Sequence, residues 1–565
     1  MIKKKLFAMV TYPCGSPIIP RDSAGEARFA VTSGGQIIQG EPIMILKHSL
    51  AMSASSFAFA AMAAFSTAAN AHHFTRHPLG PLARPAHVEP PFHMPAGGTW
   101  TNLKNGFPGP TGPESMDLMT DGTVLMHSWC SVTWWRLTPD KKGNYVNGKW
   151  TQAASLSNYR PFFMSSQVLP DGRLIINGGE YDATSEGNCS ASWTNKGALY
   201  DNVANTWTSV SPPAGWSNIG DAQSVILAKL PYMLANCCTS QQAIAKISGN
   251  NVTWNATGSG KADINDEEGW TLLPSGKIVT VDANKGLGQN FSLTELYDPS
   301  SGTWTAGPNT ASNLVDAGSH EIGPGVLRPD GTVIWFGGAP NNNIYDSNAN
   351  TWSNAPDFPL SGYDVADGPA VLLPSGNVLV EASPGVFNPP AHFFEWDGVN
   401  LTQVSDPDDA PNDTSFQGRF LLLPSGQVLY SNDGQSPTLP IVAVYTPTGK
   451  PNRDWKPKIT SVSATLTHGS TNNPISGKRF NGFSQGAYYG DDAGGATNYP
   501  IVMIKNNGTG DICFGRSHDF SRMGVAGTKT TNAQFDVPSS CETGVSTLTV
   551  SVNGISSKGI AVTVN

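Results

Sequence analysis

The chain has 565 residues and a formal net charge of −9 at pH 7. Only 14% of its residues are charged, against about 25% in an average soluble protein. This acidic balance offers no long-range attraction to phosphate backbones and excludes nucleic acid as a partner. The 60 Gly and 43 Pro separate short β-branched runs, which excludes long helical bundles and intrinsic disorder and favours an extracellular all-β protein.

The N-terminal region predicts a secretory signal peptide. After Lys47, an Ala-, Phe- and Met-rich run over residues 49–68 ends in Ala69-Asn70-Ala71. A basic residue, an apolar stretch and an A-x-A site occur in this order in signal peptides. We expect residues 1–71 to form a leader that is cleaved after Ala71, with translation starting at Met1 or Met44. A transmembrane anchor is the alternative, but the run is weakly apolar and no stop-transfer sequence follows.

The mature protein is therefore expected to be secreted, extracellular or periplasmic, and without membrane attachment. Cleavage removes Cys14 and leaves six cysteines. An even number of cysteines in an exported protein indicates disulfides. We expect Cys513 to pair with Cys541. Cys237 and Cys238 are adjacent, so they form either a vicinal ring or separate bonds to Cys130 and Cys189; a Cys130–Cys189 bond with a vicinal pair is favoured.

A turn followed by a β-rich run recurs six times along the chain. The turn glycines are Gly122, Gly172, Gly276, Gly331, Gly376 and Gly426. Their spacings are 50, 104, 55, 45 and 50 residues, and the double spacing predicts a degenerate seventh unit near 224–235. A Tyr-Asp pair also recurs, with a Trp seven residues after the Tyr, at Tyr200 and Trp207, Tyr297 and Trp304, and Tyr345 and Trp352.

Each unit of roughly 50 residues fits a four-stranded blade of the kelch type, and seven blades close a ring. The predicted fold is all-β: a seven-bladed propeller over residues 95–455, followed by an immunoglobulin-like sandwich over 458–565. A repetitive sandwich or a solenoid is the alternative. Because the last unit lacks an outer strand, we expect residues 98–102 to complete it and lock the ring. We expect a monomer.

A secreted kelch propeller followed by an early-set domain resembles the galactose oxidase and glyoxal oxidase family over roughly residues 95–565. This resemblance implies a copper radical site built from a Cys, a Tyr cross-linked to it, a Tyr-His pair and a His from the last domain. The matching positions here carry Phe163, Gly220-Asp221, Phe416-Gln417 and His518. Only His518 keeps a ligand type, so we expect the architecture without the copper chemistry. A copper oxidoreductase with an altered site is the alternative.

Polar side chains precede the inner strand of most units, where a propeller lines the mouth of its channel. We expect ligand contacts from Arg160, Asp221, Glu268, His320, Glu321, Asp367, Arg419 and His518. Candidates for proton transfer are Asp221, Glu267, Glu268, His320, Asp367 and His518. Such a set suits a carbohydrate or another polyol, or the acid–base chemistry of a hydrolase or lyase. Alternatively, the charges only neutralise one another and hold the blades in register.

Aromatic side chains could add a platform for a sugar ring. Tyr488 and Tyr489 lie in the last domain, and Trp129, Trp134 and Trp135 lie in the first unit. Kelch blades also use Trp in packing, so a core position is the alternative. The sequence assigns no metal site and leaves open whether the protein is an enzyme.

Overall fold

The computed structural model describes residues 97–189, 192–434, 441–490 and 494–565. The chain divides into two compact units, Met1–Ser16 with Met94–Asn565, and Pro17–His93. All described residues belong to the first. The predicted leader and its cleavage site lie outside the described residues. Within the described ranges, no helix is both long and apolar enough to span a bilayer.

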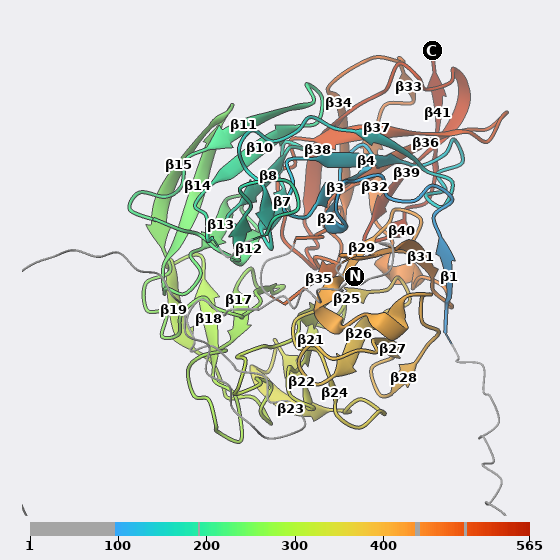
Figure 1. Ribbon diagram of the computed structural model, residues 1–565. Coiled ribbons are helices and arrows are strands. Elements are labelled where there is room, and N and C mark those ends of the chain that lie inside the picture. The colour runs from blue at the N-terminus through green and yellow to red at the C-terminus, as the bar shows by residue number, and fades with distance from the viewer. Residues whose placement is uncertain (1–96, 190–191, 435–440, 491–493) are drawn as a thin grey trace, which may run out of the picture. The chain divides into compact units, whose positions relative to one another are not determined.

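Seven antiparallel blades of four strands each form a ring (Figure 1). Blades one to four contain β2 (Pro113–Leu118), β3 (Val124–Ser128), β4 (Trp134–Thr138), β5 (Lys149–Gln152); β7 (Ser165–Val168), β8 (Leu174–Asn177), β10 (Gly197–Asp201), β11 (Thr206–Val210); β12 (Ser224–Ile226), β13 (Tyr232–Ala235), β14 (Gln242–Ser248), β15 (Asn251–Thr257); and β16 (Thr271–Leu272), β17 (Ile278–Val281), β18 (Thr294–Asp298), β19 (Thr303–Ala306). Blades five to seven contain β20 (Gly325–Leu327), β21 (Thr332–Phe336), β22 (Asn342–Asp346), β23 (Thr351–Ala355); β25 (Ala370–Leu372), β26 (Val378–Pro384), β27 (His392–Trp396), β28 (Leu401–Gln403); and β29 (Gly418–Leu422), β30 (Val428–Asn432), β31 (Val442–Thr446), β1 (Thr99–Asn102). The predicted all-β, seven-bladed propeller is confirmed.

The two recurring sequence signals have direct structural causes. At the turn between β7 and β8, Gly172 adopts a φ of 84°, which side chains with a Cβ rarely tolerate, and its N–H donates to the Leu169 carbonyl at 2.9 Å. In the outer half of the same blade, Tyr200 and Trp207 are cross-strand neighbours with ring centroids 4.8 Å apart. Such pairs stabilise neighbouring strands, which explains why the Tyr-Asp and Trp spacing recurs.

Two irregular blades were also predicted. The degenerate unit forms β12 and β13, although its turn has lost the usual glycine. The N-terminal strand β1 pairs antiparallel with β31, so that Trp100 lies opposite Tyr445. The ring therefore closes by joining the beginning of the described chain to its last blade, and this removes an exposed edge.

The C-terminal residues form a second β-structure. Its strands are β32 (Lys458–Val462), β33 (Thr465–Leu466), β34 (Asn473–Lys478), β36 (Ile501–Asn506), β37 (Ile512–His518), β38 (Thr530–Asp536), β39 (Gly544–Val552), β40 (Ile555–Ser556) and β41 (Ile560–Val564). The first half of β37 pairs with β36 and its second half with β38, so it links two groups of strands. This arrangement is compatible with the immunoglobulin-like sandwich, which stays a prediction.

Two of the predicted disulfides are confirmed. Cys130 is bonded to Cys189 and Cys513 to Cys541, with Cα atoms 5.6 and 5.4 Å apart. The sulfur atoms of Cys237 and Cys238 lie 3.0 Å apart, well beyond an S–S bond of about 2.05 Å. The structure therefore does not contain the favoured vicinal ring.

Replacing Cys513 and Cys541 together by Ser is expected to lower the free energy of unfolding by about 3 kcal/mol, because the bond closes a loop across a separation of 28 residues. Urea unfolding followed by circular dichroism measures the change. The oxidised parent is the reference. In dithiothreitol, which also reduces Cys130–Cys189, the parent and the variant should have the same stability. A double variant as stable as the oxidised parent would contradict the prediction.

Candidate functional site

Inner strands of neighbouring blades contact one another, as β2 does with β7 and with β29. In a propeller the blades repeat around one axis, so their inner strands all begin at the same end of the pore. We call this end the mouth. Loops that precede an inner strand reach the mouth, and so do loops that follow a second strand, because the second strand runs the opposite way. Both kinds of loop supply the polar side chains described below.

A segment of the C-terminal part passes along the axis of the ring. Its strand β35 (Ala487–Tyr488) pairs with the inner strand β25, near the centre of the blades (Figure 1). The Gln485 side chain accepts a hydrogen bond from the Leu272 N–H of blade four at 3.2 Å. A Cβ at Gly494 would lie 2.2 Å from the Ser166 carbonyl of blade two, so glycine is required for this close approach. We call residues 484–490 and 494–497 the pore segment.

Carboxyl groups from three blades gather at the mouth. Glu180 follows the second strand of blade two, whereas Asp266 and Asp367 precede inner strands β16 and β25. Burial, together with the charges of Asp367 and Asp266, raises the pKa of Glu180 to about 8, against the opposing hydrogen bond from Tyr181. Burial also raises the pKa of Asp367 to about 6, against the opposing effects of Arg419 and the Tyr489 hydroxyl. Near neutral pH the mouth therefore holds both a protonated and an ionised carboxyl group.

Arg419 places a positive charge beside these acids. Its guanidinium lies 3.5 Å from the centroid of the Tyr489 ring and 5.5 Å from that of Phe163. The same side chain donates to the Phe416 carbonyl at 2.7 Å, and the Tyr489 hydroxyl donates to this carbonyl at 2.6 Å. The pore segment thus fixes Arg419 between aromatic rings, and only Tyr489 of the predicted aromatic platform residues takes part in this group.

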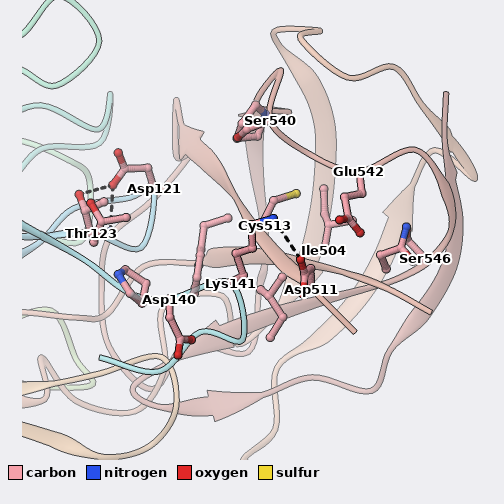
Figure 2. A pocket seen from close by; sticks show the side chains of 16 residues that line it. Asp121, Thr123, Asp140, Lys141, Ile504, Asp511, Cys513, Ser540, Glu542 and Ser546 are labelled. Atoms are coloured by element: carbon pink, nitrogen blue, oxygen red, sulfur yellow. Dashed lines mark hydrogen bonds and ion pairs between the residues drawn. The ribbon is translucent and has the colours of Figure 1, made fainter. Parts of the chain in front are cut away.

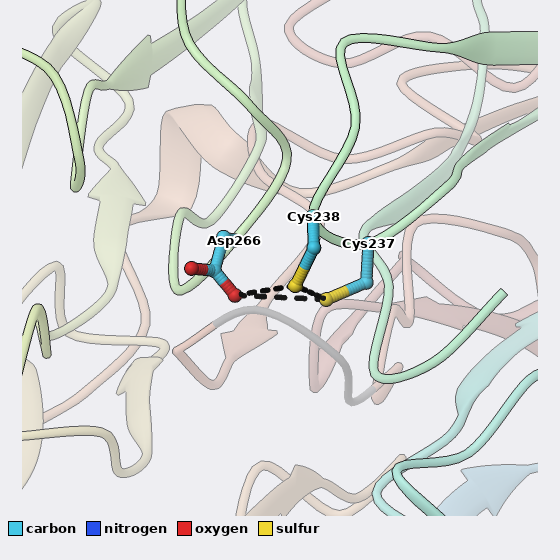
Figure 3. A group of neighbouring side chains, drawn as sticks. All are labelled: Cys237, Cys238 and Asp266. Atoms are coloured by element: carbon cyan, nitrogen blue, oxygen red, sulfur yellow. Dashed lines mark hydrogen bonds between the residues drawn. The ribbon is translucent and has the colours of Figure 1, made fainter. Parts of the chain in front are cut away.

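A second group at the mouth combines sulfur, carboxyl and imidazole side chains. Asp266 Oδ1 lies 3.0 Å from Cys238 Sγ and 3.6 Å from Cys237 Sγ (Figure 3). Asn284 donates from its side-chain nitrogen to the Asp266 carbonyl at 3.1 Å, and Asn284 Oδ1 lies 2.6 Å from His320 Nδ1. Burial raises the pKa of Asp266, while Asn284, Cys237 and His320 oppose this shift.

Several loops at the mouth contain a residue with a strained backbone. Phe163, Glu267 and Asp367 each stand seven residues before a turn proline and adopt φ values of 50°, 58° and 57°. His320 and Cys238 also have positive φ, at 71° and 59°. Non-glycine residues hold this conformation at a cost of about 1–3 kcal/mol and do so mainly at functional sites. The strain marks the mouth as the candidate site independently of its charges.

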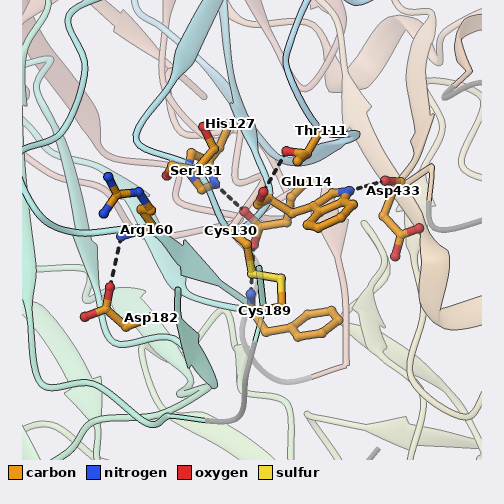
Figure 4. The surroundings of a disulfide bond; sticks show 11 residues. Thr111, Glu114, His127, Cys130, Ser131, Arg160, Asp182, Cys189 and Asp433 are labelled. Atoms are coloured by element: carbon orange, nitrogen blue, oxygen red, sulfur yellow. Dashed lines mark hydrogen bonds and ion pairs between the residues drawn. A yellow bond between two sulfur atoms is a disulfide. The ribbon is translucent and has the colours of Figure 1, made fainter. Parts of the chain in front are cut away.

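Four of the predicted site residues belong to the mouth or the pore: His320, Asp367 and Arg419 as described, and Asp221, whose charge raises the pKa of Tyr181. Glu267 and Glu321 are buried in loops that reach the mouth, with 9% and 2% exposure. Arg160 lies in the loop that precedes the inner strand of blade two. Its backbone N–H donates to the Asp182 carboxylate, and the Cys130–Cys189 disulfide lies nearby (Figure 4).

The prediction for Glu268 is wrong. Its carboxylate lies 2.7 Å from Lys261 Nζ inside blade four, and both side chains have 0% exposure. The Thr280 hydroxyl donates to the second carboxylate oxygen at 2.6 Å. Glu268 therefore neutralises a buried lysine and is closed to any ligand. For this residue the alternative explanation applies, in which the charges only neutralise one another.

The prediction that His518 reaches the mouth is also wrong. His518 ends β37, and its two ring nitrogens lie 2.9 Å from Asp519 and 3.2 Å from Asp536. The next residues pack on the turn that follows β7, where the Phe520 N–H donates to the Pro170 carbonyl at 3.0 Å. This turn is at the opposite end of the inner strand from the mouth. The segment that does enter the pore carries Tyr489.

The sequence analysis missed Glu180 and Asn284. Both follow second strands, β8 and β17, whereas the polar pattern of the sequence pointed to the loops before inner strands. A usable signal existed for Glu180, because it comes directly after the Gly178-Gly179 pair that ends β8. His127 was not proposed as a ligand, and its ring is in fact buried between Glu114 at 2.8 Å and the Ser131 carbonyl at 2.9 Å.

The residues at the positions implied for copper do not fit that metal. Phe163 and Phe416 carry no ligand atom. The Gln417 amide is already engaged, donating to Asp433 Oδ1 and accepting from the Thr414 N–H, both at 3.1 Å. The positive charge of the Arg419 guanidinium would also repel a copper ion bound beside it. Cys237, Cys238 and Asp266 do bring three ligand atoms within 4.8 Å of one another, but that donor set differs from the Tyr and His set of the family.

A cleft of about 330 Å³ lies away from the mouth, between blade one and the C-terminal strands (Figure 2). Of its lining residues, Asp511 pairs with Lys141 at 3.5 Å and also with Lys142, which lies outside the lining, at 2.6 Å. Asp121 binds the Thr123 hydroxyl at 2.6 Å. Four acids line the cleft, Asp121, Asp140, Asp511 and Glu542, but none of its lining residues has the left-handed φ of Phe163, Glu267 and Asp367 at the mouth.

No protein-family model and no curated protein sequence matches the chain. Among solved structures, a fungal alcohol oxidase of the AA5 family, in complex with copper, is 13% identical over 84% of this chain and 100% of its own, with a TM-score of 0.46. A catalytically inactive virginiamycin B lyase from Staphylococcus aureus, with quinupristin, is 10% identical over 62% of this chain and 98% of its own, with a TM-score of 0.43. At such identities and TM-scores these matches carry no inference about the family or the activity of this chain.

Proposed function

We propose that this protein is a secreted propeller that binds a carbohydrate or another polyhydroxylated ligand at the mouth, without copper. The observation that carries the proposal is the meeting of Glu180, Asp266 and Asp367 with an Arg419 held on the Tyr489 ring. A protonated carboxyl donates and an ionised one accepts, so neighbouring hydroxyls of a polyol find both partners.

The non-ligand residues at the implied copper positions support this proposal over an altered oxidase. The two disulfides support export, since such bonds persist in oxidising compartments. Acid–base chemistry on the bound ligand is a second candidate, favoured by the unequal pKa values of Glu180, about 8, and Asp367, about 6. Release of a shortened or unsaturated sugar from a bound glycan would distinguish it from binding alone.

A glycan array with the labelled protein is the first test, followed by titration calorimetry with the best free saccharide. The Arg419→Gln substitution should weaken binding at least tenfold, because Arg419 is the cation fixed beside the acids. Loss of one hydrogen bond made by a charged group has about this effect.

The matched control is Arg173→Gln, since Arg173 belongs to the turn at the other end of blade two, where it lies 2.5 Å from Asp171. This variant should bind like the parent, and an unchanged circular dichroism spectrum should show that Arg419→Gln is folded. The proposal fails if neither the array nor calorimetry detects a saccharide or polyol, or if both variants weaken binding equally.

A further inference from the structure

His320 and Asn284 determine each other's hydrogen-bonding state. The Asn284 side-chain nitrogen faces Asp266, where it donates to the backbone carbonyl at 3.1 Å. The amide is thereby oriented with Oδ1 towards His320 Nδ1, 2.6 Å away. An amide oxygen only accepts, so Nδ1 must carry the proton, and in the neutral ring the lone pair then lies on Nε2.

The loop that carries Asn284 is firmly anchored. Asp263 Oδ2 accepts the backbone N–H groups of Asn284 and Lys285 at 3.0 and 3.2 Å. The Asp263 N–H in turn donates to Glu295 at 3.2 Å, and this glutamate pairs with the buried Lys261 at 2.6 Å. The position of the Asn284 amide therefore derives from an ion network inside blade four.

The His320 backbone is held just as firmly from the other side. Its N–H donates to the Asp316 carbonyl at 2.8 Å, and the Asp316 N–H donates to the Glu321 carbonyl at 3.0 Å. The left-handed φ of 71° persists only when its surroundings hold it. No hydrogen bond to Nε2 occurs among the residues that the structure describes, and the ring is half-buried. Nε2 is thus the ring nitrogen left for a ligand.

We propose that His320 presents Nε2 as the hydrogen-bond-accepting, basic nitrogen of the mouth and that Asn284 is the positioning residue that fixes this tautomer. The inference deepens the proposed function, on which it rests for its ligand: a hydroxyl that donates to Nε2 beside the Asp266 carboxyl group. Nothing in the spacing of the chain indicates this pair, because 36 residues and a blade boundary separate the two side chains.

Ring nitrogen NMR tests the tautomer without any ligand. In the full chain labelled with ¹⁵N-histidine, the signals lost in His320→Gln identify this ring. We expect Nδ1 to be protonated in the parent and in Asn284→Asp, which keeps the accepting oxygen. Asn284→Leu removes that oxygen and should move the ring towards the Nε2-protonated form. A parent ring protonated on Nε2, or a ring unchanged by Asn284→Leu, would overturn the inference.

Diethyl pyrocarbonate, which acylates an unprotonated ring nitrogen, tests whether Nε2 is available. Two histidines of the protein serve as internal controls, because His127 and His518 each have both ring nitrogens within 3.2 Å of a hydrogen-bond partner. Peptide mapping by mass spectrometry should show His320 modified at least tenfold faster than His127 and faster than His518. Equal rates would overturn the inference.

The same reaction separates this inference from the proposed function. A saccharide selected on the array should slow the modification of His320 and leave His518 unaffected. If the tautomer and the reactivity are as expected but no saccharide binds, the proposed function fails, while the assignment of Nε2 and the role of Asn284 stand. If a saccharide binds and His320 keeps its full reactivity, the assignment of Nε2 to the ligand is wrong.

Discussion

Replacing Lys261 by Met is expected to lower the free energy of unfolding by about 4 kcal/mol. Lys261 Nζ lies 2.7 Å from Glu268 and 2.6 Å from Glu295, and these side chains are 0–2% exposed. Burial alone would lower the pKa of Lys261, but the charges of Glu268 and Glu295 raise it above its usual range. Without the lysine, two carboxylates stay buried with no adjacent cation, and such a loss is among the largest that one substitution causes.

Urea unfolding at pH 7, followed by tryptophan fluorescence, measures this change. Lys277→Met is the matched control, because Lys277 pairs with Asp298 at 3.2 Å on the surface of the same blade, with 46% and 34% exposure. Such exposed pairs contribute less than about 1 kcal/mol. Adding Glu268→Gln and Glu295→Gln to Lys261→Met should restore part of the stability. Equal losses from Lys261→Met and Lys277→Met would contradict the buried network.

The second large effect is a fall in the free energy of unfolding as pH rises. Between pH 4.5 and 7, the Asp117→Asn variant should lose about 3 kcal/mol less than the parent. Burial raises the pKa of Asp117 to about 7, against about 3.9 in an unfolded chain. In this window the folded state keeps a proton that the unfolded state has lost. The free energy of unfolding therefore falls as pH rises, by about 1.4 kcal/mol per pH unit for one such group.

Thermal or urea unfolding across this pH range measures the slope for the parent and the variant. Asp298→Asn is the control, because serine and lysine contacts lower the pKa of Asp298 to about 2, so this group does not titrate in the window. Asp364 and Asp413, whose pKa values burial raises to about 7, should leave a residual slope in Asp117→Asn. An Asn variant with the same slope as the parent would refute the prediction.

The mouth is a site that two separated parts of the chain build together. Arg419 comes from the last blade and Tyr489 from the pore segment, which enters along the axis. Because β35 pairs with β25, a ligand that moves Tyr489 would also strain the contact between the propeller and the C-terminal strands.

Several features of this protein followed from its sequence alone. The turn glycines marked six blades, and their double spacing located the seventh. The Tyr and Trp spacing located the outer strands, and the missing last strand predicted the closure by β1. The Cys130–Cys189 and Cys513–Cys541 pairs also followed. The blades depend on local rules, namely positive φ at turn glycines, alternation along strands and the length of one repeat, and such rules are visible in any single unit. The closure by β1 followed from counting the strands of the last unit, and the disulfides from counting the cysteines of an exported chain.

The composition of the site was decided by the tertiary structure. Asp266 and Glu268 would lie on one face of a regular strand, yet Glu267 between them has a φ of 58°, and the two carboxyl groups part. Asp266 meets Cys237 and Cys238, whereas Glu268 meets Lys261. Similarly, His518 ends a strand held by Asp519 and Asp536, while a glycine at position 494 lets the pore segment, residues 484–490 and 494–497, approach blade two closely. Three features decided the site: residues with left-handed backbone conformation, close approach between backbones, and side-chain contacts across blades. All three depend on contacts between distant segments, so no local pattern of residues encodes them.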